Sequence, residues 1–207
     1  MSDRISARRA LVLDPAGTAT ARAVTTRLES EGYDVDTYAV FAEPTGPIDA
    51  FVYEPGLLDG TLTGNSAERL ITVVARLTPF LRAPEEGGSR IVVVASRDGL
   101  GCPSRPDLAA QSGALVSAAR SLALQLGRTG TTVNVIAALP PEGSPLRGAG
   151  RPANTHLYEP EALTPKPVTV HDIAETVAFF LNPRSGYITG QVLNCCGGAS
   201  LLSSLSV

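Results

Sequence analysis

The chain has 207 residues, of which 43% are hydrophobic and 18% charged, and this composition predicts one well-buried globular domain spanning residues 1–207. Its 17 basic and 20 acidic residues give a formal charge of −3, with no basic block beyond Arg8 and Arg9, which argues against nucleic acid as a partner. No apolar run is long enough for a membrane-spanning helix, and the first residues carry no apolar signal region, so we expect a cytoplasmic protein with no membrane partner.

The first third of the chain alternates strands with a helix. Residues 10–13 predict a short apolar strand, residues 20–31 a helix closed by Gly32, and residues 33–40 a second strand. Strand, turn, helix and strand in this order are typical of the opening of a dinucleotide-binding unit. Only a turn-sized linker then precedes another apolar strand at residues 48–52.

The middle of the chain adds a helix and a buried strand. Asn65 or Ser66 begins the helix, with Glu68 placed as in a capping box, and Pro79 limits it. The apolar stripe of this helix consists of Leu70, Val73, Val74 and Leu77. Residues 91–94 predict the strand, which ends at Ser96, and residues 97–103 are expected to form a flexible loop.

Residues 112–139 predict a helix that leads directly into a strand, which is half of a parallel-sheet repeat. Gly127 and Gly130 end the helix, and residues 131–139 are β-branched and apolar. The apolar residues of this helix that recur at helical spacing are Leu115, Ala118, Ala119, Leu122 and Leu126. A long loop rich in Pro and Gly occupies residues 140–167, a capping box at residues 169–172 opens a last helix, and the final strand lies within residues 187–194.

Three of these segments resemble the short-chain dehydrogenase/reductase family, and in particular its 3-oxoacyl reductases. Residues 112–139 resemble the family's catalytic helix with the strand after it, residues 48–52 its fourth strand, and residues 187–198 its last strand. The resemblance implies an α/β fold of the Rossmann type, a three-layer αβα sandwich. Because the linker before residue 48 is too short for the family's third strand and the helices beside it, the resemblance also implies a shortened parallel sheet of six strands with the third-strand region deleted.

The family's glycine motif, which binds the cofactor diphosphate, is missing from the matching residues 14–21. Asp14, Pro15, Ala19 and Ala21 stand in its place, and Gly17 lies off register. Proline has no N–H to donate, alanine methyl groups block close approach, and two like charges about 4 Å apart repel by about 4 kcal/mol at an effective dielectric constant near 20. The resemblance therefore implies no NAD(P) site in this chain. Asp14 is also a candidate to cap the following helix.

The family's catalytic pair is replaced as well. Its tyrosine and lysine fall on Leu108 and Ser112, which provide neither an acid nor a cation, and the asparagines after its fourth strand are replaced by Tyr53 and Glu54. Ser96 coincides with the family's catalytic serine, although serine is also common as a turn residue at the end of a strand. We therefore expect no catalytic residues in this chain.

Because the helices and the last strand are retained, the resemblance predicts a catalytically inactive subunit. It would pair with an intact NAD(P)-dependent reductase of the family, which would hold the cofactor and act on a 3-oxoacyl or 3-hydroxyacyl thioester or a similar ketone. Pairing with a second copy of the chain is the other expected assembly. The interface candidates are apolar residues of two helices and the last strand: Leu70, Val74, Leu115, Ala119, Leu122, Leu126, Val192 and Leu193.

Two other functions remain open at this point. The vacated cleft could carry cofactor-independent catalysis by Ser96, Asp98 and Cys102, or it could bind a ligand as a sensor. Cys102, Cys195 and Cys196 lack both the spacing of zinc ligands and that of a disulfide framework. We expect reduced thiols and no metal site.

Overall fold

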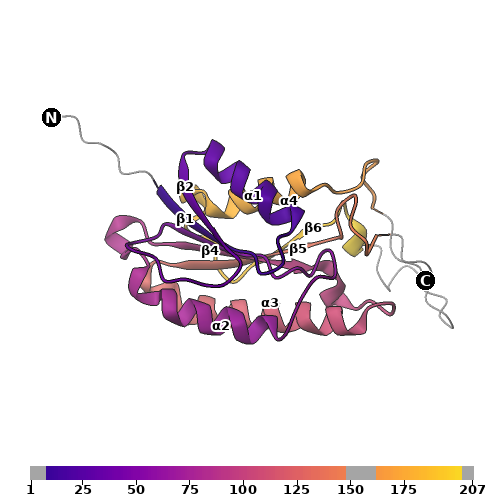
Figure 1. The fold of residues 1–207 in the computed structure, drawn as a ribbon, viewed down its shortest axis with the longest axis horizontal. Coiled ribbons are helices and arrows are strands. Elements are labelled where there is room, and N and C mark those ends of the chain that lie inside the picture. The colour runs from indigo at the N-terminus through magenta and orange to yellow at the C-terminus, as the bar shows by residue number, and fades with distance from the viewer. Residues whose placement is uncertain (1–7, 148–161, 202–207) are drawn as a thin grey trace.

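Six parallel strands form one sheet in the computed structural model, which describes residues 8–147 and 162–201 (Figure 1). The strands are β1 (Arg8–Leu13), β2 (Tyr33–Tyr38), β3 (Ala50–Tyr53), β4 (Arg90–Ser96), β5 (Thr132–Ala138) and β6 (Val192–Cys195). They lie in the order β2-β1-β3-β4-β5-β6, and each neighbouring pair is parallel. This arrangement confirms the predicted α/β sheet of six strands.

The α-helices of the described residues cover both faces of the sheet. α1 (Ala19–Ser30) and α4 (Val170–Leu181) lie on one face, and α2 (Ser66–Leu77) and α3 (Pro106–Leu126) on the other (Figure 1). Since successive side chains of a strand point to opposite faces, each buried strand contributes to two apolar layers. Val12, Val52 and Val92 pack beneath α1 and α4, and Leu11, Phe51 and Ile91 pack beneath α2 and α3.

The helix caps predicted from the sequence are present at α2 and α4. The Asn65 side chain accepts a hydrogen bond from the N–H of Glu68 at 3.1 Å, which identifies Asn65 as the N-cap of α2. Thr169 and Asp172 form a reciprocal capping box at the start of α4. Such caps satisfy N–H groups that have no partner within the helix.

The connection between β2 and β3 is short, and it leaves β2 at the edge of the sheet. Residues 39–49 form this connection and lie against the C-terminal end of α2. Oε1 of Glu43 is 3.1 Å from Nη2 of Arg76, and the guanidinium group of Arg76 lies 4.7 Å from the ring centre of Phe41. The third-strand region is therefore replaced by a linker that contacts the C-terminal end of α2.

Six of the eight interface candidates are buried in the chain's own core, which corrects their assignment to a subunit interface. The apolar stripes of α2 and α3 face the sheet, so these side chains are at most 8% exposed within a single chain. The six are Leu70, Val74, Leu115, Ala119, Leu122 and Leu126. In β6, Val192 is half-buried and Leu193 is 40% exposed. A partner that contacts α2 or α3 must therefore touch their outward side chains.

Both described ends of the loop predicted at residues 140–167 pack on other loops. The Ser144 hydroxyl donates to the carbonyl of Leu58 at 2.6 Å, and the N–H of Leu163 donates to the carbonyl of Gly197 at 2.7 Å. Residues 148–161 of this loop lie outside the described residues. Across residues 8–147 and 162–201, no helix combines the length and the apolar character needed to cross a membrane.

Candidate functional site

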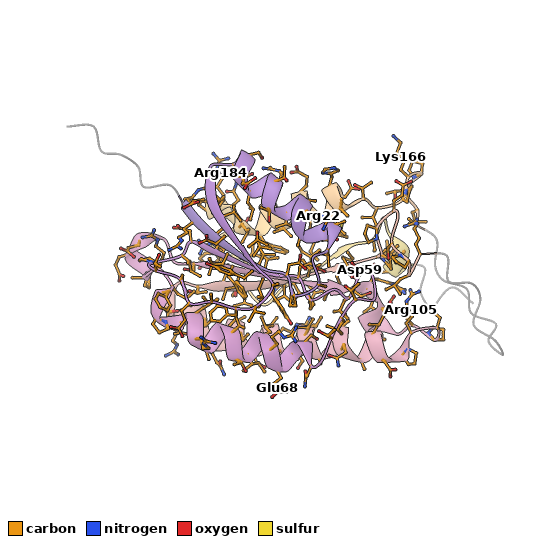
Figure 2. All side chains as sticks on the ribbon, in the orientation of Figure 1. Arg22, Asp59, Glu68, Arg105, Lys166 and Arg184 are labelled. Atoms are coloured by element: carbon orange, nitrogen blue, oxygen red, sulfur yellow. The ribbon has the colours of Figure 1, made fainter. Side chains whose placement is uncertain are left out.

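Buried polar side chains gather where β1, β3 and β4 end, at the carboxyl edge of the sheet. Asp14 follows β1, Glu54 follows β3, and Arg97 and Asp98 follow β4, and each of them is at most 4% exposed. Figure 2 shows Asp59 and Arg105 at this same end of the molecule. Open α/β sheets bind their ligands outside the carboxyl ends of their strands, so this edge is the candidate site.

Asp14, Thr18 and Glu54 form a hydrogen-bonded cluster at the N-terminus of α1. Oδ2 of Asp14 accepts from the N–H of Thr18 at 2.8 Å, and the Thr18 hydroxyl accepts from the N–H of Ala21 at 3.0 Å. The same hydroxyl donates to Oε2 of Glu54 at 2.7 Å, and Oε1 of Glu54 accepts from the N–H of Gly56 at 3.3 Å. The cap of α1 is thus Thr18, and Asp14 supports it by binding the N–H of Thr18, which modifies the predicted capping role of Asp14.

Both carboxyl groups of this cluster have raised pKa values. The pKa of Glu54 is raised to about 7, mainly by burial and also by the neighbouring Asp14 charge, while the hydrogen bond from Thr18 lowers it. Burial also raises the pKa of Asp14, against the lowering effect of the N–H of Thr18. Two buried carboxylates at one helix end repel each other, so the cluster retains a proton more readily than two exposed carboxyl groups would.

The residues at the N-terminus of α1 do not fit the diphosphate of a dinucleotide. In a Rossmann fold a helix N-terminus offers free N–H groups and the close approach that glycine allows. Here the N–H of Thr18 is bonded to Asp14, and Ala16 closes the turn against Gly56, where an added Cβ would lie 3.2 Å from the Ala16 methyl carbon. Two buried carboxyl groups add negative charge at the same place. The half-buried Pro15, with no N–H, and Ala19, the first residue of α1, complete the substituted motif.

Ser112 uses its hydroxyl to hold the end of β4. Its Oγ accepts from the N–H of Ser96 at 3.1 Å and donates to the carbonyl of Ser96 at 2.5 Å. An added Cβ on Gly99 would lie 3.0 Å from this Oγ, so little space surrounds Ser112. A lysine side chain at this fully buried position would have to displace the segment after β4.

Ser96 and Leu108 have structural contacts in place of the family's catalytic geometry. The Ser96 hydroxyl accepts from the N–H of Asp98 at 3.1 Å and caps the 3-10 helix η3 (Arg97–Leu100). Leu108 is partly buried against the apolar layer beneath α2 and α3. The turn-residue interpretation of Ser96 thus has a hydrogen bond to support it.

The segment after β4 is an ordered 3-10 helix, which corrects the expected flexible loop at its first four residues. Nε of Arg105 is 2.9 Å from Oδ2 of Asp98, and these two side chains are 6% and 2% exposed. Nη2 of Arg105 donates to Oδ1 of Asp98 at 3.4 Å, and Nη1 donates to the carbonyl of Leu146 at 3.0 Å. Arg105 therefore connects η3, the start of α3 and the loop after β5. Because both oxygens of Asp98 are bound to Arg105, the carboxylate of Asp98 is not free to act on a substrate.

The sulfur atoms of the three cysteines contact Ser104, Thr176 and Ser200, which lie outside this cluster of carboxyl groups. The Cys102 sulfur lies 3.2 Å from the Ser104 hydroxyl in the loop before α3. Cys195 is the last residue of β6 and Cys196 follows it; both are free thiols, and burial raises the pKa of Cys195. Within the part of the chain that the structure describes, no group of three or more His, Cys, Asp or Glu side chains is placed to hold a metal ion.

Three features of the site could not be identified from the sequence. The hydrogen bond between Thr18 and Glu54 joins residues 36 positions apart. The ion pair between Asp98 and Arg105 depends on the path of the chain around Gly101. The third feature is Arg97, whose side chain is only 4% exposed. A charged residue in a polar stretch predicts exposure, so the only sequence signal was its position directly after a buried strand.

Comparison with known proteins supports both the fold and the family. Residues 65–200 match the family model described as enoyl-(acyl carrier protein) reductase. The chain is 32% identical over 203 residues to subunit BbsC of the (2S)-[(R)-hydroxy(phenyl)methyl]succinyl-CoA dehydrogenase of Thauera aromatica, a match that covers 91% of this chain and 78% of BbsC. It is 34% identical over 129 residues to subunit BbsD of that dehydrogenase, a match that covers 58% of this chain and 48% of BbsD.

Among solved structures, a double variant of a Serratia marcescens short-chain dehydrogenase/reductase has a similar fold. The TM-score is 0.72 at 22% sequence identity, and the superposition covers 93% of this chain and 98% of the other. At this identity the likeness concerns the fold alone. The alignment with BbsD spans about half of that relative's length, whereas the alignment with BbsC spans more than three quarters.

Proposed function

The chain belongs to the short-chain dehydrogenase/reductase family, and from this premise we propose that it is a non-catalytic subunit of an NAD(P)-dependent reductase. The observation that carries the proposal is the cluster of Asp14, Thr18 and Glu54 at the N-terminus of α1. This cluster places the chain's own carboxyl groups where a dinucleotide-binding member of the family would receive a diphosphate. Hydride transfer needs a bound nicotinamide, so the reaction would take place in the partner subunit.

The replaced catalytic pair supports the same proposal. The Ser112 hydroxyl is hydrogen-bonded to both the N–H and the carbonyl of Ser96, and Leu108 packs against the apolar layer beneath α2 and α3. A general acid in the family's reaction must provide a proton, and its loss typically slows such a step by about 10²- to 10⁴-fold. Neither position offers a group that titrates.

The names of two relatives favour an assembly of unlike subunits. BbsC and BbsD are both named as subunits of one (2S)-[(R)-hydroxy(phenyl)methyl]succinyl-CoA dehydrogenase, and both are similar to this chain. We infer by analogy that the partner of this chain is an intact reductase that acts on a 3-oxoacyl or 3-hydroxyacyl thioester. Pairing with a second copy of the chain is the alternative assembly.

Outward apolar side chains of α2 and α3 are the surface we assign to this partner. Leu124 on α3 is 86% exposed and Ile71 on α2 is 49% exposed, whereas the apolar stripes of both helices face the sheet. Exposed aliphatic side chains on adjacent helices favour packing against another helical pair. Leu193 of the edge strand β6 is a second candidate contact.

Co-expression with an intact reductase encoded in the same genome tests the proposal. We expect the two chains to co-purify and Leu124→Asp to weaken their association at least about tenfold, since a charge placed in an apolar contact must be desolvated. Val40→Asp, at a side chain that is 82% exposed on the linker beside β2, is the matched control and should bind normally. A chain that stays monomeric and binds no reductase would contradict the proposal.

A further inference from the structure

Arg97 is a buried cation at the carboxyl edge of the sheet, and part of its guanidinium group is unpaired. It follows Ser96 directly and begins η3, and its side chain is 4% exposed. Its Nε and Nη2 atoms are buried and have no hydrogen-bond partner among residues 8–147 and 162–201. A guanidinium group keeps its proton in proteins, so it cannot avoid the cost of burial by becoming neutral.

The carboxylates of the same edge form their hydrogen bonds with groups other than Arg97. Asp98, the next residue, gives both oxygens to Arg105, at 2.9 and 3.4 Å. Glu54 accepts from Thr18 and Gly56, and Oδ2 of Asp14 accepts from Thr18, whereas Oδ1 of Asp14 is buried without a hydrogen-bond partner among the described residues. The described part of the chain therefore supplies no counter-ion to Arg97, although a buried cation is strongly disfavoured without one.

The two unpaired nitrogens lie along the same edge of the planar guanidinium group. Nε and Nη2 point their N–H groups in the same direction, and this pair matches the two oxygens of a carboxylate in a bidentate contact. A single free cation balances one negative charge, and Asp14 and Glu54 add negative charge elsewhere at the carboxyl edge of the sheet. Both features favour a monovalent carboxylate over a phosphate dianion.

We propose that Arg97 anchors the carboxylate of a small organic acid at the carboxyl ends of β4 and β5, beside Ser96. This site goes beyond the proposed role as a non-catalytic subunit, because it gives the chain a ligand of its own. The carboxylate would accept hydrogen bonds from Nε and Nη2 of Arg97. No bond is made or broken in the ligand.

Thermal unfolding and calorimetry of the full chain test this site, with sodium butyrate as the probe carboxylate. Sodium chloride at the same ionic strength is the reference, and sodium phosphate is a separate arm. We expect butyrate to raise the melting temperature beyond the chloride reference, with a dissociation constant of about 1 mM. Arg97→Met should weaken butyrate binding about 10- to 100-fold, because hydrogen bonds to a charged group are lost.

The variants separate a ligand anchor from a residue that only supports the fold. Without butyrate, Arg97→Met should melt at or above the wild-type temperature, because it removes a buried cation that lacks a counter-ion. Arg97→Lys keeps the charge and loses the bidentate contact, so it should also bind butyrate more weakly. Arg184→Met, at an exposed side chain after α4, removes the same charge and should bind butyrate like the wild type.

Several results would overturn the proposal. These are the absence of a butyrate effect beyond chloride, equal butyrate binding by the wild type and both Arg97 variants, or a larger effect of phosphate than of butyrate. A lower melting temperature of both Arg97 variants without ligand would also assign Arg97 to the support of the fold. None of these results bears on association with a reductase, which is measured separately.

Discussion

Glu54→Gln is expected to raise the stability of the chain at pH 8 and to leave it unchanged near pH 4.5. The pKa of Glu54 is about 7 in the folded chain, against 4.5 for an unperturbed glutamate, so folding disfavours the ionised form. The loss of folding free energy caused by ionised Glu54 is absent below pH 4.5 and grows as the pH rises. It is complete above pH 7, where it reaches about 3 kcal/mol. Glutamine has the same shape without a titrating proton, so the variant avoids this cost.

Circular dichroism melts at the two pH values measure the effect. At pH 8 we expect the melting temperature of Glu54→Gln to rise by up to about 6–12 °C, at about 2–4 °C for each kcal/mol. Glu29→Gln, at an exposed position of α1, is the matched control and should show no such pH-dependent difference. A lower melting temperature of Glu54→Gln at pH 8 would mean that the ionised carboxylate is stabilised by a further group beyond Thr18 and Gly56.

Arg105→Ala is expected to destabilise the fold by about 3–5 kcal/mol, because it leaves Asp98 buried without its counter-ion. The two side chains are 6% and 2% exposed, and Arg105 also holds the carbonyl of Leu146. The melting temperature should fall by about 6–20 °C. Chemical denaturation of the variant and the wild type gives the free-energy difference directly.

The exposed ion pair between Arg76 and Glu43 provides the control for this experiment. Its side chains are 50% and 55% exposed, so Arg76→Ala should cost less than about 1 kcal/mol. The double variant with Asp98→Ala and Arg105→Ala should recover part of the loss, since it removes the unpaired charge. Equal destabilisation by Arg105→Ala and by the double variant would show that Asp98 does not need a counter-ion.

The fold could be predicted largely from local patterns in the sequence. Helix starts depend on residues three positions apart, as in the contacts of Asn65 with Glu68 and of Thr169 with Asp172. The prediction of six strands depended on the length of the linker between β2 and β3, which is too short for another strand and its helices. Both kinds of information are available without knowledge of the three-dimensional contacts.

The interface residues and the buried charges could not be predicted in this way. The apolar stripe of α3 predicts that one face of the helix is covered, but the sequence does not say whether the sheet or a partner covers it. In the structure the sheet covers Leu115 and Leu122, and Leu124 points outward. Likewise, Asp98 and Arg97 are adjacent in the sequence, and only the position of Arg105 determines which of them is paired.

Isothermal titration of the purified chain with NADPH tests the central claim most directly. We expect no binding of NADPH at concentrations up to about 1 mM, since Asp14 and Glu54 occupy the N-terminus of α1 and the N–H of Thr18 is hydrogen-bonded to Asp14. An intact reductase of the same family, titrated under the same conditions, shows that the cofactor is competent to bind. Micromolar binding of NADPH by this chain alone would contradict its assignment as a non-catalytic subunit.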